Sequence, residues 1–398
     1  MKKIRIVIIS VVYLCITLIS PIYTNADGSD NPAEIAQSNS ISNNEIFNNV
    51  SAKSGILFET TTQTVIAEKN SNEKRQIGHL AKLMTVLITE ENIKNGKLKL
   101  TDKVTASANA NSQNAPQIWL NAGEKITVDE LLKAITIGNA NDACVALAEK
   151  IGGNESKFLS IMNKKAKHLG MKNTYFADVC GNNENTVSTA YDLALLSREL
   201  LKHNDLTEYF TTWICSIRNK ATELVSTNRL IRTYKDCIGL KSCASKLSGE
   251  CLISTVKRNN MEMCCVLISS ESEDSKFSEA KSVMDYGFTA FEIYEPELSN
   301  EILKKIDLNN GEQLYANVKL NDLHNVLIPR GTYKQITCDF NREESVSAPV
   351  KKGQKIGTVT FKNDKEVILK SDIVIADDIR KIGVLFAVKK LLLNLLYM

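Results

Sequence analysis

The order of the expected secondary-structure elements constrains the fold of this 398-residue chain most strongly. Residues 52–69 hold two short apolar runs around a polar turn, which predicts a pair of strands. Residues 237–269 again show three apolar runs typical of strands, and the segments between these two regions are helical in period. Strands on both sides of a block of helices predict an α+β domain with helices on an antiparallel sheet.

The helical block contains several segments whose apolar residues recur at helical spacing. The expected helices are Leu80–Ile93, a helix opening at Thr127, Asp142–Ile151, Ser156–Leu169 and Ala190–His203. Thr127-x-x-Glu130 is a capping box, in which each side chain binds the backbone N–H of the other residue.

The pattern changes after about residue 290. Residues 300–377 show short alternating runs broken by Gly, Asn, Asp and Pro, which predicts a small all-β module. We therefore expect a first domain over residues 46–293 and a β-rich domain over residues 294–377.

The N-terminus resembles a secretory signal peptide. Residues 1–26 combine a positive start (Lys2, Lys3 and Arg5), an apolar run over Ile6–Ile19 and a small-residue site at Ala26. The alternative is an uncleaved membrane anchor, but the apolar run falls short of the roughly 20 residues that a spanning helix needs. We expect export, with residues 27–45 forming a flexible leader.

The C-terminal segment 378–398 is apolar and carries Lys389 and Lys390 near its middle. We expect an amphipathic helix that lies in the membrane surface, which would place the protein on the extracytoplasmic face. The alternatives are a short spanning helix, which the lysines make costly, and a last helix packed on a domain.

Charge and cysteine content bear on two classes of protein, nucleic-acid binders and metal-binding proteins. Lys and Arg total 49 against 46 Asp and Glu, so a strongly basic nucleic-acid binder is not expected. Cys15 lies in the predicted signal peptide, so nine of the ten cysteines would remain after its cleavage. No C-x-x-C pair is present among them. The four histidines show no ligand spacing with these cysteines, so we predict no metal site and mostly free thiols.

Three short motifs point to chemistry. They read His79-Leu80-Ala81-Lys82, Asn139-Ala140-Asn141 and Lys241-Ser242-Cys243. Longer matching blocks surround or follow them, at Leu131–Gly153, Met162–Phe176, Ser188–Ser197, Ile238–Asn259 and Ala348–Thr358. In this order the blocks resemble the serine-type D-alanyl-D-alanine carboxypeptidases, the low-molecular-mass penicillin-binding proteins.

The resemblance implies a penicillin-binding, β-lactamase-like domain, a small all-β domain and a C-terminal amphipathic helix. It also implies three motifs, S-x-x-K, S-x-N and K-T-G, that converge on the substrate. In this family the first Ser is the nucleophile and its Lys takes the proton, while the K-T-G strand binds the terminal carboxylate of the peptide.

This chain departs from that pattern at four positions, of which Ser242 in place of the Thr is conservative. His79 stands in place of the nucleophilic Ser, Asn139 in place of the second Ser, and Cys243 in place of the Gly. By family position, the catalytic set would be His79, Lys82 and Asn139. The substrate-binding set would be Asn141, Lys241, Ser242, Cys243 and Ala244, with no cofactor.

Several functional hypotheses follow. The preferred one is a catalytically inactive family member that binds a D-Ala-D-Ala wall peptide, a β-lactam-like ligand or an unidentified protein partner. Rerouted chemistry at His79 or Cys243 is a second reading, and an ordinary active carboxypeptidase is a third. A β-lactamase is disfavoured because that class lacks the β-module and the anchor.

Overall fold

The computed structural model describes residues 44–364, 366–384, 386 and 388. The predicted signal peptide, the leader up to residue 43 and the C-terminal segment from residue 389 lie outside the described residues. Within the described part of the chain, no helix combines the length and the apolar character that crossing a membrane requires.

A five-stranded antiparallel sheet forms the centre of the first domain, in the order β2-β1-β11-β10-β9. Its strands are β1 (Ser54–Glu59), β2 (Thr64–Lys69), β9 (Cys237–Ser245), β10 (Gly249–Arg258) and β11 (Met261–Ser270). The two runs expected at 52–69 and the three expected at 237–269 therefore join in one sheet through the pairing of β1 with β11. In this sheet, β9 is an edge strand.

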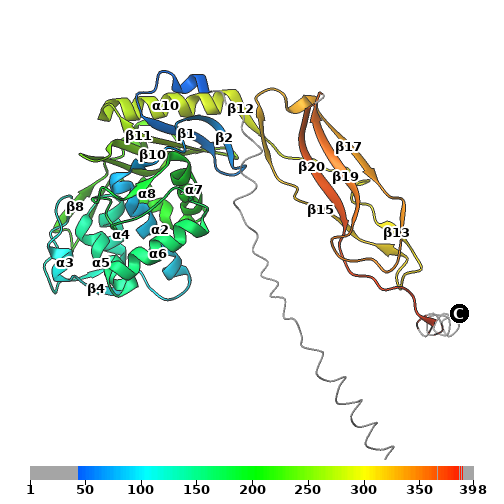
Figure 1. Ribbon diagram of the computed structural model, residues 1–398, viewed down its shortest axis with the longest axis horizontal. Helices are drawn as coiled ribbons and strands as arrows, with labels where there is room; N and C mark the ends of the chain where they lie inside the picture. The colour runs from blue at the N-terminus through cyan, green and yellow to red at the C-terminus, as the bar shows by residue number, and fades with distance from the viewer. Residues whose placement is uncertain (1–43, 365, 385, 387, 389–398) are drawn as a thin grey trace, which may run out of the picture. The chain divides into compact units, whose positions relative to one another are not determined.

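Helices cover both faces of this sheet (Figure 1). Helix α10 (Glu273–Ala290) packs on one face with its own apolar cluster. The other face carries the helical block, whose buried side chains form the largest core cluster. These helices are α2 (Lys82–Lys94), α4 (Val128–Thr136), α5 (Asn141–Gly152), α6 (Glu155–His168) and α7 (Ala190–Leu201). The expected α+β arrangement is confirmed.

Local sequence explains where several helices begin. The capping box of α4 is present, because Thr127 accepts a hydrogen bond from the Glu130 N–H and the Glu130 carboxylate accepts one from the Thr127 N–H. Asn154 and Thr189 each cap their helix, α6 and α7, with a side-chain oxygen that accepts one hydrogen bond from the first turn.

Shorter elements connect these helices and strands. They are η2 (Asn44–Phe47), β3 (Arg75–Gln76), η3 (Gly78–Ala81), β4 (Lys103–Thr105), α3 (Ala108–Asn111), β5 (Lys125–Thr127), β6 (Val187–Ser188), η4 (Asn204–Leu206), α8 (Thr207–Thr211), β7 (Ile214–Ile217), β8 (Thr222–Val225) and α9 (Leu230–Thr233).

The second domain is built from strands around a separate apolar core. Its elements are β12 (Phe291–Tyr294), β13 (Ile306–Asn309), β14 (Tyr315–Ala316), β15 (Val318–Asn321), β16 (Val326–Pro329), η5 (Tyr333–Gln335), β17 (Ile336–Arg342), β18 (Ser345–Ser347), β19 (Lys355–Asn363) and β20 (Glu366–Ile375). The four-stranded sheet has the order β15-β20-β19-β17. Strand β12 spans the predicted boundary between residues 293 and 294, and it pairs with β16 of the second domain.

Candidate active site

The first motif lies at the start of α2, where the chain turns sharply. His79 is part of η3, and Lys82 is the first residue of α2, so the two side chains lie one helical step apart. A glycine contact sets this turn against the loop that holds Gly181. A Cβ built on Gly181 would lie 1.8 Å from the Gly78 carbonyl oxygen, and both residues have positive φ, so each position requires glycine.

Four side chains form a continuous row of hydrogen bonds. The Lys82 amine donates to the Asn139 carbonyl oxygen at 2.5 Å and lies 3.4 Å from the Asn139 Oδ1. The Asn139 Nδ2 lies 3.3 Å from the His79 Nδ1, and the His79 Nε2 lies 3.1 Å from the Asn182 Oδ1. Because the Asn139 amide donates to Nδ1, the ring proton resides on Nε2, which donates to Asn182.

Burial and like charges determine the protonation of this row. Burial, together with the charges of Lys82 and Lys241, lowers the pKa of His79 to about 3. The imidazole is therefore neutral at pH 7. Burial also lowers the pKa of Lys82, and burial followed by the charge of Lys82 lowers the pKa of Lys241 to about 7.

The third motif lies on β9, at the edge of the sheet. The buried Lys241 amine donates to the carbonyl oxygen of Ile135 at 2.8 Å. The Ser242 hydroxyl is buried without a hydrogen-bond partner, whereas Ala244 is exposed. The structure therefore brings His79, Lys82 and Asn139 into direct contact and holds Lys241 close enough to affect the pKa of His79.

Cys243 does not project into open space at the strand edge. Its side chain is buried, with Sγ 3.9 Å from the Ile77 carbonyl oxygen, and it faces Cys251 in the register of β9 and β10. The thiol fills the core, and its contact with the Cys251 thiol, followed by the charge of Lys241, lowers the pKa of Cys243 although burial opposes this shift. All nine cysteines that the structure describes are free.

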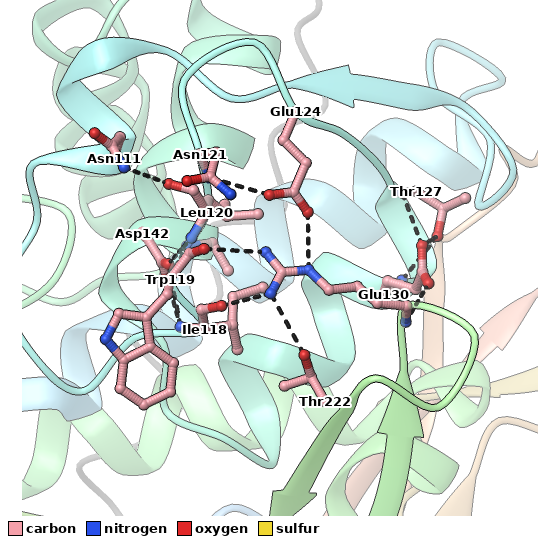
Figure 2. Close-up of polar contacts among 12 residues, drawn as sticks. Asn111, Ile118, Trp119, Leu120, Asn121, Glu124, Thr127, Glu130, Asp142 and Thr222 are labelled. Atoms are coloured by element: carbon pink, nitrogen blue, oxygen red, sulfur yellow. Dashed lines mark hydrogen bonds and ion pairs between the residues drawn. The ribbon is translucent and has the colours of Figure 1, made fainter.

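Asn141 and Asp142 form hydrogen bonds with the loop that precedes α4 in the chain. Asn141 donates from its backbone to Pro116 and from its side chain to Asn114. The Asp142 carboxylate accepts from the backbone N–H group of Ala143. It also accepts from those of Ile118 and Leu120 (Figure 2). The side chain of Asn141 is thus used structurally, although its Oδ1 is buried without a partner.

Asn182 is a site residue that sequence reasoning missed. Its signal was weak, because a polar residue after a glycine in a loop is typical of any turn. The backbone N–H of Asn182 donates to the Asp178 carboxylate, which fixes the loop and directs the amide oxygen to His79.

A second cluster was not expected from spacing. Glu91, Glu199 and His203 bring possible ligand atoms within 4.8 Å of one another. Lys165 pairs with Glu91 and Lys202 pairs with Glu199, so lysines already neutralise both carboxylates. We therefore interpret this cluster as an ion-pair network that connects α2, α6 and α7.

Comparisons with known proteins agree with this architecture. Residues 38–272 match the family described as D-alanyl-D-alanine carboxypeptidase, which is more than half of the chain. The chain belongs to the D-alanyl-D-alanine carboxypeptidase family. Residues 289–381 match the C-terminal domain of penicillin-binding protein 5, so the expected resemblance is confirmed over both domains.

Individual relatives cover most of the chain. D-alanyl-D-alanine carboxypeptidase DacF of Bacillus subtilis is 34% identical over 85% of this chain and 88% of its own length. D-alanyl-D-alanine carboxypeptidase DacC of Escherichia coli is 28% identical over 84% of this chain and 86% of its own length. The crystal structure of penicillin-binding protein 5 from Haemophilus influenzae has a TM-score of 0.74 at 23% identity, covering 83% of this chain and 98% of that one, and supports the fold.

Proposed function

We propose that this family member is an exported cell-wall protein that binds D-Ala-D-Ala stem peptides without serine-type acyl transfer. One observation carries the proposal: the Lys82 amine donates to Asn139, and the residue at the nucleophile position, His79, uses both ring nitrogens in hydrogen bonds. Serine-type catalysis needs a hydroxyl whose proton the Lys can accept, and neither His79 nor Asn139 supplies one.

The imidazole of His79 is itself a poor candidate nucleophile in this arrangement. A neutral imidazole attacks with the lone pair of its unprotonated nitrogen, which here is Nδ1. That lone pair accepts the Asn139 amide at 3.3 Å. Attack on a peptide carbonyl would require the hydrogen bond between Asn139 and His79 to break.

Two features support retained peptide binding. Strand β9 is an edge strand, so a peptide can add to it through main-chain hydrogen bonds, as in β-augmentation. Lys241 lies on this strand with a pKa of about 7, so part of the population carries a positive charge at neutral pH that attracts a terminal carboxylate. A β-lactam carboxylate would use the same cation.

An active D-Ala-D-Ala carboxypeptidase is the second candidate. Family membership favours it, because the relatives DacF and DacC both carry that name. Activity would require a rerouted nucleophile, such as Cys243 after its thiol leaves the core.

The test combines labelling, turnover and binding. The purified protein is incubated with a fluorescent penicillin and examined for a covalent band, and D-Ala release from an N-acylated Lys-D-Ala-D-Ala peptide is assayed in parallel. No band and no release, with saturable peptide binding, supports the proposal. D-Ala release, together with a stoichiometric band that is lost in His79→Ala or Cys243→Ala, establishes the second candidate instead.

Localisation belongs to the same proposal. The signal-like residues 1–26 support export, and the apolar segment 378–398 supports attachment to the extracytoplasmic surface of the cell membrane. Protease added to intact cells without a wall should digest the protein, and a chain truncated at residue 377 should leave the membrane fraction. Protection from protease in intact cells would contradict export.

A further inference from the structure

Trp119 is held on the surface in an unusual backbone conformation. Its side chain is 70% exposed, and its φ of +54° lies in the left-handed region that bulky residues rarely adopt. Backbone outliers of this kind persist where the surroundings impose them, and they concentrate at functional sites. A single exposed aromatic residue needs no explanation, but an exposed tryptophan on strained backbone does.

The surrounding contacts fix both neighbours of Trp119. The N–H groups of Ile118 and Leu120 donate to the Asp142 carboxylate at 3.0–3.1 Å. The Leu120 carbonyl accepts from Asn111 at 2.6 Å. The side chains of Ile118 and Leu120 are buried, so the intervening indole is directed outward (Figure 2).

Arg218 fixes the same loop from the turn between β7 and β8. Its guanidinium donates to the carbonyl oxygens of Ile118 at 2.6 Å and Trp119 at 3.4 Å, and it forms an ion pair with Glu124 at 2.8 Å. Its own backbone N–H donates to Glu130, which belongs to the capping box of α4. In Figure 2 the indole of Trp119 points away from Glu124 and Glu130.

This platform adjoins the second motif of the candidate site. Asp142, which anchors Ile118 and Leu120, directly follows Asn141, and the Asn141 N–H donates to the carbonyl of Pro116 in the same loop. The loop that presents the indole of Trp119 is therefore hydrogen-bonded to the motif that contains Asn139 and Asn141. We propose that Trp119 binds the glycan portion of the wall polymer by stacking on a sugar ring.

The chemistry around Trp119 favours a neutral sugar. The flat indole matches the apolar C–H face of a pyranose ring, and little backbone entropy is lost because hydrogen bonds already hold the loop. Amide side chains are frequent in residues 109–121 and offer both donors and acceptors to hydroxyl and acetamido groups. With a net charge of +3, the chain lacks the basic character that stacking on a nucleic acid would require. The choice of wall glycan rests on the proposed function.

Fluorescence provides a direct test, because the chain contains two tryptophans, Trp119 and Trp213. In Trp213→Phe, the emission reports Trp119 alone. Addition of an oligomer of N-acetylglucosamine should shift or quench this emission in a saturable way. In Trp119→Phe, where only Trp213 emits, the same oligomer should leave the emission unchanged. An unchanged emission of Trp213→Phe at saturating oligomer would overturn the inference.

Co-sedimentation with purified insoluble wall glycan gives an independent measurement. Trp119→Ala should weaken binding at least fivefold, whereas Trp119→Phe should retain part of it. Tyr175→Ala is the matched control, since Tyr175 is also exposed (55%) but lies outside this loop. Equal losses in Trp119→Ala and Tyr175→Ala would contradict a specific role for Trp119, and circular dichroism checks that each variant is folded.

A short peptide arm separates this inference from the proposed function. Trp119→Ala should bind an N-acylated Lys-D-Ala-D-Ala peptide, which carries no sugar, as the unmodified chain does. If the unmodified chain does not bind the peptide but still responds to the glycan, the proposed function is refuted and the inference stands. Peptide binding without any glycan response would refute the inference alone.

Discussion

The Nδ2 atom of Asn139 lies 3.3 Å from the Nδ1 atom of His79. These residues occupy the two positions at which the family pattern has serines, and they are 60 residues apart in the chain. Each satisfies a buried polar atom of the other, so the two departures from the pattern form one compatible pair. Reverting one of them leaves the other without its partner.

His79→Ser alone should therefore fail to restore acylation. The Lys82 amine would still donate to the Asn139 carbonyl, and Asn139 would lack a partner for its amide. We expect no covalent band with fluorescent penicillin from this variant. The triple variant His79→Ser, Asn139→Ser, Cys243→Gly is the matched comparison, and a stoichiometric covalent band from the single variant would contradict the argument.

Stability should decrease in acid partly through His79. Its folded pKa of about 3 lies below the ordinary 6.5, so the unfolded chain binds the extra proton more readily. The contribution to stability is complete above pH 6.5 and is lost as the pH falls toward 3, by up to about 4 kcal/mol. His79→Gln should flatten the pH dependence of urea unfolding in this window, whereas exposed His324→Gln should not.

Lys241 should also make the free energy of unfolding rise with pH, but over a higher pH range than His79. Its folded pKa of about 7 lies below the ordinary 10.5, so stability rises with pH between these values. Lys241→Met, which keeps the length but cannot be charged, should reduce this rise in unfolding measurements from pH 7 to 10.5. An unchanged slope would show that the amine is solvated in the folded protein.

Gly181→Ala should be strongly destabilising. The added Cβ would lie 1.8 Å from the Gly78 carbonyl oxygen, and φ is +80°, so the loop that carries Asn182 must move. We expect a loss of more than about 3 kcal/mol. Gly123→Ala is the matched control, because φ is +85° there but nothing lies within 4 Å, and it should cost only about 1 kcal/mol.

Asp142→Asn should loosen the Trp119 loop. An amide nitrogen would face backbone N–H donors that the carboxylate now accepts, which costs about 2 kcal/mol. Thermal unfolding and the fluorescence anisotropy of Trp119 in a Trp213→Phe background measure the two effects. Asp339→Asn, which breaks an exposed ion pair with Lys362, should change the stability by less than about 1 kcal/mol.

Thiol reactivity should follow burial. Cys338 is exposed, while Cys264 is buried and its pKa is raised to about 12. A thiol reagent should therefore modify Cys338 rapidly in the native protein, and Cys338→Ser should remove this fast phase. Rapid modification of Cys243 in the native state would show that its thiol leaves the core, which rerouted chemistry requires.

Local signals predicted much of this protein correctly. The apolar runs at 52–69 and 237–269 gave the strands of the central sheet, and Thr127 with Glu130 gave the start of α4. These features depend on residues a few positions apart, which interact in any context that allows the element to form. The motif positions of His79, Lys82 and Asn139 came from the resemblance to the carboxypeptidase family, and the family match supports that assignment.

The partners of those residues were decided only by the tertiary structure. The contact of His79 with Asn182 spans 103 residues, and the Cys243 thiol turns into the core beside Cys251, because long-range packing selects the orientation of a side chain. The same holds for Trp119, whose exposure depends on Asp142 and Arg218 from distant segments. The sequence by itself determined which residues occupy the site positions, and the fold determined which atoms those residues can still offer to a ligand.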